Sequence, residues 1–161
     1  MINFFRGQEA APSLTENAEK AVTCFRGGIN CTQALLSTYG RRFGLDEDLA
    51  LGVAGAFGSG MGIGETCGAV TGALMVIGLK YSRIRGGVYL SREKTYDRAA
   101  YFISRFRERN NTVVCRDLLG CDVTTREGFK QAKKEKHFKK RCPKFVQDAA
   151  EILEEILARD E

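Results

Sequence analysis

Residues 64–79 read GETCGAVTGALMVIGL, and this stretch predicts a buried core helix that begins near Glu65. It is shorter than the roughly 20 apolar residues that a membrane crossing requires. Gly64, Gly68 and Gly72 recur every four residues and therefore share one helix face. Because this face has no side-chain bulk, a second helix can approach it closely, and tight helix packing is expected here.

A glycine-rich segment, FGSGMGIG at residues 57–64, precedes this helix. Alternating glycines are unfavourable inside a helix or a strand, so the segment is predicted to be a loop. Successive backbone N–H groups that lead into a helix can bind an anion, but the Gly-Lys-Ser/Thr ending of a phosphate-binding loop is missing. The favoured interpretation is that these glycines let the chain pass close to a cysteine site.

Capping residues and apolar stripes predict further helices along the chain. The first three are expected from the capping box at Ser13 to Gly27, from Asn30 to near Gly44, and from Asp46 to Ala56. A fourth begins at the Ser91 cap and has the apolar stripe Tyr96, Ala99, Ile103 and Phe106. The last three are expected from Cys115 to Gly120, from the capping box of Thr124 and Glu127 onward, and from Pro143 to about Arg159. No segment alternates like the strands of a hairpin. The sequence therefore predicts an all-α fold, a compact single domain of six to eight helices over residues 1–161, in which residues 1–12 form a flexible N-terminal segment.

The composition is that of an ordinary globular protein of 161 residues. A domain of this length buries enough surface to fold without disulfides. The net charge of +5 is concentrated in residues 83–109 and 130–144, and such runs are usually solvated helix faces. No aromatic stacking pattern accompanies them, so no nucleic-acid partner is expected.

The cysteines are expected to act in metal binding or catalysis rather than to form structural disulfides. The first residues lack a basic segment followed by an apolar run, so we expect a cytoplasmic protein without a membrane span. In a reducing compartment, six cysteines indicate metal binding or catalysis. No C-x-x-C pair is present, so the tertiary fold has to build any shared site.

Four of the six cysteines lie at predicted helix N-termini: Cys31, Cys67, Cys115 and Cys142. A helix N-terminus offers unpaired N–H groups and the positive end of the helix dipole, which favour a thiolate over a thiol. The neighbouring Arg116 and Arg141 are expected to add to this effect. We therefore expect the four thiols to converge in one site, as catalytic residues or, in the alternative interpretation, as metal ligands. For any single cysteine, the role of a small buried hydrophobic residue stays open.

Cys67 is expected to be the most reactive thiol, because the glycines around it keep side-chain bulk away. In the competing interpretation these glycines serve only helix packing, and Cys67 is buried and inert. Cys24 and Cys121 lie at C-terminal ends of predicted helices, where a thiolate is not favoured, so both are expected to be dispensable. His137, the only histidine, lies in a lysine-rich run and is expected on the surface.

Five segments together resemble one known family: Asn30–Ala34, Phe57–Gly62, Gly64–Met75, Cys115–Gly120, and Cys142 before the last helix. In order and spacing they are similar to the C_GCAxxG_C_C family of redox-active proteins. The resemblance implies four characteristic cysteines, which fall here on Cys31, Cys67, Cys115 and Cys142. It also implies a frequent neighbourhood with transport genes and a relation to the cysteine-bearing part of split-Soret cytochromes, where an iron cluster is suspected. Thr32 stands where the family usually has alanine.

Two classes of function stay open on the sequence. In the first, the thiols undergo reversible oxidation or electron transfer in a redox enzyme or carrier. In the second, they bind an iron–sulfur cluster or another thiolate-bound metal in a sensing, carrier or structural role. The expected partner is a redox partner protein or a transport-linked protein, and a homo-oligomer is compatible with either class.

Overall fold

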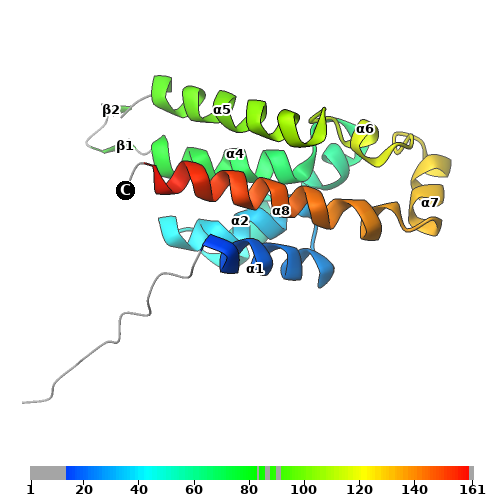
Figure 1. The fold of residues 1–161 in the computed structure, drawn as a ribbon. Coiled ribbons are helices and arrows are strands. Elements are labelled where there is room, and N and C mark those ends of the chain that lie inside the picture. Colours follow the sequence, from blue (N-terminus) through cyan, green and yellow to red (C-terminus); the bar gives the residue numbers. More distant parts are fainter. Residues whose placement is uncertain (1–13, 83, 86–87, 90–91, 160–161) are drawn as a thin grey trace, which may run out of the picture.

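The computed structural model describes residues 14–82, 84–85, 88–89 and 92–159. Within these ranges the chain forms eight α-helices, which confirms the predicted all-α fold (Figure 1). Their bounds are α1 Leu14–Arg26, α2 Cys31–Gly40, α3 Glu47–Val53, α4 Gly68–Tyr81, α5 Arg92–Asn110, α6 Cys115–Leu119, α7 Arg126–Lys134 and α8 His137–Ala158. The predicted N-terminal segment 1–12 and the predicted caps Ser13 and Ser91 lie outside the described residues.

Helix α8 is the central helix of the bundle. It packs against α1 and α2 on one side and against α4 and α5 on the other, while α6 and α7 contact it near one end (Figure 1). Its apolar face is buried as predicted, with Ala149, Ile152 and Ile156 at most 1% exposed.

Shorter elements connect these helices. Two single turns, η1 Arg41–Phe43 and η2 Gly55–Phe57, follow α2 and α3, so α3 ends earlier than the predicted Ala56. The segment η3 Gly60–Gly64 is a wide turn with left-handed residues inside it, which agrees with the predicted loop. Strands β1 Ile84–Arg85 and β2 Val88–Tyr89 pair antiparallel over two residues each. Strands this short leave no alternating pattern in the sequence, and they do not change the all-α class.

Helix α4 is the buried core helix, but it begins at Gly68 instead of near Glu65. Thr66 forms a β-bridge with Val114, and Cys67 is the N-cap of α4. The predicted close packing against α2 is confirmed, because a Cβ atom on Gly72 would lie 2.9 Å from the Leu35 Cβ. Among the described helices, none has both the length and the apolar character that a membrane crossing needs.

Helix α8 begins six residues earlier than predicted, at His137 rather than at Pro143. The residues before Pro143 include no other helix breaker, and the helix extends back to Lys136, whose left-handed backbone marks its start. Since proline has no N–H, Pro143 leaves the Lys139 carbonyl without its helical donor. Cys142 therefore lies in the second turn of α8 and not at a helix N-terminus, which corrects its predicted placement.

The start of α7 is one residue later than predicted. Thr125 is the N-cap, and its hydroxyl oxygen accepts a hydrogen bond from the Gly128 N–H at 3.0 Å. Thr124 instead bonds to Asp122 through both its N–H and its hydroxyl. Adjacent threonines suit a capping position equally well, so the sequence could not decide between them.

The predicted apolar stripe of α5 is confirmed at Phe106 and wrong at Tyr96. Phe102 and Phe106 are fully buried, whereas Tyr96 is 64% exposed. The guanidinium of Arg92 lies 5.7 Å from the centre of the Tyr96 ring. Tyr96 therefore belongs to the charged outer face of α5, and the phenylalanine pair marks its true inner face.

Two groups of buried apolar side chains form the interior. The larger core lies among α1, α2, α4, α5 and α8, and the smaller core lies where α6 and α7 meet α8. Cys31 and Cys67 belong to the larger core, whereas Cys115 and Cys142 belong to the smaller one. The four predicted site cysteines thus lie on both sides of the boundary between the two cores.

Candidate redox site

Cys31 is the first residue of α2, and side-chain hydrogen bonds fix its position. The Gln33 N–H donates to Asn30 Oδ1 at 2.9 Å, and the Asn30 N–H donates to Gln33 Oε1 at 3.0 Å. The same side chains tie α2 to α3 and η2, because Gln33 Nε2 donates to the Leu51 carbonyl and Asn30 Nδ2 to the Gly55 carbonyl. The predicted Asn30 cap is confirmed, and it anchors the first site cysteine.

A short antiparallel contact holds Cys67 and Cys115 side by side. The Cys67 N–H donates to the Val113 carbonyl at 2.8 Å, and the Cys115 N–H donates to the Glu65 carbonyl at 2.6 Å. A single β-bridge lies between these two bonds. The N-terminus of α6 is therefore fixed against the N-cap of α4.

The structure brings all four predicted cysteines together, although they come from four different helices or caps. Cys31 lies close enough to Cys142 in α8 for this second thiol to raise its pKa. Cys67 interacts electrostatically with Cys31, and Cys115 interacts with both Cys67 and Cys31. We call this group, Cys31, Cys67, Cys115 and Cys142, the cysteine cluster.

Three thiols of the cluster have a raised pKa. The pKa of Cys31 is well above its usual value because its thiol interacts with the neighbouring Cys142 thiol and because it is buried. Burial raises the pKa of Cys67 to about 12, and the neighbouring Cys31 adds to this shift. Burial also raises the pKa of Cys115, with a further contribution from Cys67. These three sulfurs are consequently protonated at neutral pH.

The prediction that helix N-termini favour thiolates has the wrong sign here. The expected amide contacts exist, because the N–H groups of Ala69 and Val70 lower the pKa of Cys67. The N–H group of Ser59 acts in the same way on Cys31. A helix terminus contributes at most about 2 kcal/mol, whereas removing a charge from water costs more than that. Burial therefore decides the net shift.

Cys67 is not the accessible nucleophile that the sequence predicted. Cys67 is only 3% exposed to solvent. A Cβ atom on the adjacent Gly68 would lie 2.6 Å from Thr32 Oγ1 and 3.2 Å from the Cys31 Cβ. The glycine at this position serves the close approach of α2 and α4, which is the competing interpretation of the sequence.

The predicted approach of the glycine-rich segment to the cysteines is confirmed. Gly60 has a φ of +61°, and a Cβ atom there would lie 2.9 Å from the Cys115 Cβ and 2.5 Å from the Glu65 nitrogen. Ser59, beside it, also has a left-handed backbone and supplies its N–H to Cys31. The segment thus covers the cluster with backbone where no side chain would fit.

The two arginines near the cysteines act differently from the expectation. Arg116 forms an ion pair with Glu65 at 2.6 Å. Arg141 lowers the pKa of Cys121, although burial of this thiol outweighs the arginine and the net shift is upward. Cys121 in turn contributes to the raised pKa of Cys115, so it adjoins the cluster even though its position after α6 excluded it on the sequence.

The arrangement of the thiols does not match a metal site. Within the described residues, no group of three or more His, Cys, Asp or Glu side chains is placed to hold a metal ion. The alternative interpretation of Cys31, Cys67, Cys115 and Cys142 as ligands of an iron–sulfur cluster or another metal therefore gains no support from the geometry.

Residues 29–156 match a family model with the description "Putative redox-active protein (C_GCAxxG_C_C)". The chain belongs to this family. All four members of the cysteine cluster lie within the matched range. No curated protein and no solved structure matches the chain.

Thr32, at the position where the resemblance implies alanine, is accommodated by hydrogen bonds. Its hydroxyl is fully buried, donates to the Gly68 carbonyl at 3.0 Å and lies 3.2 Å from the Thr71 hydroxyl. A buried hydroxyl with partners costs little. The substitution therefore adds a polar link between α2 and α4 beside Cys31.

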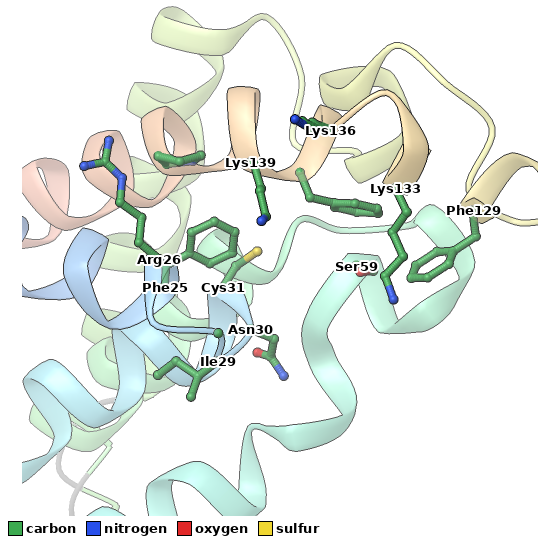
Figure 2. Close-up of a pocket in the computed structure, with 13 residues that line it drawn as sticks. Phe25, Arg26, Ile29, Asn30, Cys31, Ser59, Phe129, Lys133, Lys136 and Lys139 are labelled. Carbon is green, nitrogen blue, oxygen red and sulfur yellow. The ribbon is translucent and has the colours of Figure 1, made fainter. Parts of the chain in front are cut away.

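A surface cavity of about 610 Å³ reaches the cluster at Cys31, and Figure 2 shows the Cys31 sulfur pointing into it. Its apolar lining includes Phe25, Phe129 and Phe138. The basic residues that line it are Arg26, Lys133, Lys136 and Lys139. We call this space the Cys31 cavity; none of its lining residues is acidic.

The Cys31 cavity of this C_GCAxxG_C_C protein was not predicted from its sequence. The lysine-rich run was interpreted as a solvated helix face, and most of its charged groups are indeed exposed. The signal that could have revealed the cavity is the pair Phe129 and Phe138, whose rings lie 5.4 Å apart among the lysines. His137 does not line the cavity; it pairs with Glu135 at 2.6 Å.

Proposed function

We propose that this protein is a dithiol–disulfide redox protein whose reacting pair is Cys31 and Cys142. The observation that carries the proposal is the proximity of Cys142 to Cys31, whose pKa it raises, together with the surface cavity that Cys31 lines. Two neighbouring thiols on different helices can form a disulfide if a small movement brings their sulfurs to bonding distance. Membership of a redox-active family supports the same class of chemistry.

Cys31 is the attacking sulfur in this proposal, because its sulfur points into the cavity (Figure 2), whereas Cys142 is not among the residues that line it. Its sulfur attacks one sulfur of a substrate disulfide, a mixed disulfide forms, and the first substrate thiol leaves with a proton. Cys142 then attacks Cys31, and the second substrate thiol leaves with the second proton. The protein loses two electrons and two protons, and the substrate disulfide gains them; the reverse sequence oxidises a pair of thiols.

The raised pKa of Cys31 determines how the exchange depends on pH. Only the thiolate attacks, so at neutral pH the ionised fraction of Cys31 limits the rate. The same high pKa makes the thiolate a stronger nucleophile once it forms. We expect exchange that is slow at neutral pH and accelerates roughly tenfold for each pH unit until the pKa is reached.

Cys67 and Cys115 extend the proposed reacting pair into the interior. Cys67 interacts with Cys31, and Cys115 interacts with Cys67, so each sulfur has a neighbour for a further exchange step. Such a step moves the disulfide from one pair to another without any net change in electrons. In this proposal, Cys67 and Cys115 take over the disulfide that first forms at Cys31.

A redox titration with detection at each cysteine tests the proposed function. Full-length protein is equilibrated with thiol–disulfide buffers of graded potential, and free thiols are alkylated and located by peptide mass spectrometry. Cys31 and Cys142 should lose their labels together at one potential. In Cys142→Ser, Cys31 should stay alkylatable at that potential, and Cys24→Ser serves as the matched control. If Cys31 is protected to the same extent in Cys142→Ser, the proposed pair is wrong.

A further inference from the structure

We propose that the Cys31 cavity is a binding site for small disulfides and thiols that carry carboxylate groups. This inference rests on the proposed redox function and names the class of substrate that reacts at Cys31. It is carried by three observations: the charge of the cavity lining, its aromatic walls, and the direction of the Cys31 sulfur.

The charge of the lining selects an anion. Lys133, Lys136, Lys139 and Arg26 contribute to it, and no lining residue is acidic. Figure 2 shows the ammonium groups of Lys133 and Lys139 extending toward the cavity, whereas the guanidinium of Arg26 points away from it. Within the described part of the chain, neither lysine has a carboxylate partner. Two cations without counter-ions in one concave site favour a carboxylate ligand.

The aromatic walls of the cavity favour a ligand with an apolar frame. Phe25, Phe129 and Phe138 line it, and the Lys133 ammonium lies 5.7 Å from the centre of the Phe129 ring. A volume of about 610 Å³ is in the range of small-molecule sites and fits a ligand the size of an aromatic dicarboxylate. The combination of lysine and phenylalanine therefore fits a ligand that has an apolar frame and an anionic end.

The Cys31 sulfur gives the site its chemistry. With the carboxylate held at the lysines, a disulfide bond in the ligand can approach Cys31 at the inner end of the cavity (Figure 2). Exchange then follows the proposed sequence: the ligand disulfide accepts two electrons and two protons and leaves as two thiols, and the protein retains the Cys31–Cys142 disulfide.

Reaction with two aromatic disulfides of different charge tests this inference. We use the full-length Cys24→Ser/Cys121→Ser protein in its reduced form, with dithiobis(nitrobenzoate) as the anionic disulfide and dithiodipyridine as the neutral one. In Lys133→Gln/Lys139→Gln, the rate at Cys31 with the anionic reagent should fall about tenfold, and the rate with the neutral reagent should change by less than about twofold. The matched control Lys134→Gln/Lys140→Gln should change neither rate. An unchanged anionic rate, or an equal fall with both reagents, overturns the inference.

Binding without chemistry separates this inference from the proposed function. Nitrobenzoate is titrated into the Cys31→Ser protein and followed by NMR chemical shifts. Saturable binding should weaken at least about fivefold in the Lys133→Gln/Lys139→Gln background and stay unchanged in the Lys134→Gln/Lys140→Gln background. If nitrobenzoate binds in this way but Cys31 and Cys142 never form a pair, the anion site stands and the redox function fails. If the pair forms but nitrobenzoate does not bind, the redox function stands and the substrate class is wrong.

Discussion

The Cys31 thiol at the start of α2 lies beside Cys142 in the second turn of α8, which raises its pKa. Cys31 belongs to the larger core and Cys142 to the smaller one, so this contact crosses the boundary between them. The other two cluster members divide in the same way. The cysteine cluster therefore connects the larger core with the smaller core formed by α6, α7 and α8.

Cys31 is expected to react with an alkylating agent before Cys67 does. Cys31 faces the cavity, whereas Cys67 is 3% exposed and has a pKa of about 12. Timed alkylation of the reduced Cys24→Ser/Cys121→Ser protein with iodoacetamide, followed by peptide mass mapping, gives the order. Both thiols should react at similar rates in denaturant, which is the control. Labelling of Cys67 before Cys31 in the folded protein would contradict this account.

Gly68→Ala is expected to lower the free energy of unfolding by about 1–3 kcal/mol, because the new Cβ would press on Thr32 and Cys31. Gly78→Ala in the same helix is the matched control. No atom lies within 4 Å of a Cβ atom at Gly78, so this change should be neutral or stabilise by up to about 1 kcal/mol. Denaturant titration of both variants measures the difference, and equal effects would show that close packing at Gly68 is unimportant.

Glu154 is expected to make stability fall as the pH rises from about 5 to 7. Burial raises its pKa to about 7 from 4.5, although the Tyr39 hydroxyl donates to its Oε1 at 2.8 Å. Between these values the folded state holds a proton that the unfolded state has lost, so the free energy of unfolding decreases with pH, by at most about 3 kcal/mol. Glu154→Gln should remove this slope. Denaturant titrations across this pH interval measure it, and an unchanged slope in the variant would refute the assignment.

Cys24 and Cys121 are expected to be dispensable for the redox step. Cys24 lies in α1, and Cys121 lies after α6, where it packs against the smaller core and contributes to the raised pKa of Cys115. Replacing either with serine should leave the midpoint potential of the Cys31–Cys142 pair within about 10 mV, since 30 mV corresponds to about 1.4 kcal/mol. The titration described above measures this. A larger shift in Cys121→Ser alone would make Cys121 a fifth member of the site.

Local signals predicted the helices well because they depend on neighbouring residues. The Asn30 cap and the small-residue face of residues 64–79 were predicted correctly, since both follow from residues within one or two turns. The convergence of the four cysteines was also expected, but for Cys142 the argument was wrong. It lies inside α8, and it reaches Cys31 through the packing of α8 rather than through a helix N-terminus.

The electrostatics and the cavity could not be predicted, because both depend on tertiary packing. The pKa of Cys67 results from a competition between helix amides and burial, and only the folded chain shows that burial is the larger effect. The Cys31 cavity combines residues of α1, α7 and α8 that are far apart in the sequence. A run of lysines does not reveal which of its members face such a cavity.

Disulfide mapping of the oxidised full-length protein tests the central claim most directly. The reduced protein is oxidised with a small disulfide, free thiols are blocked, and the non-reduced digest is analysed by mass spectrometry. At the first two-electron stage, we predict a linked pair of peptides that contain Cys31 and Cys142. If these two residues are recovered as blocked thiols while another cysteine pair is linked, the account of the site is wrong.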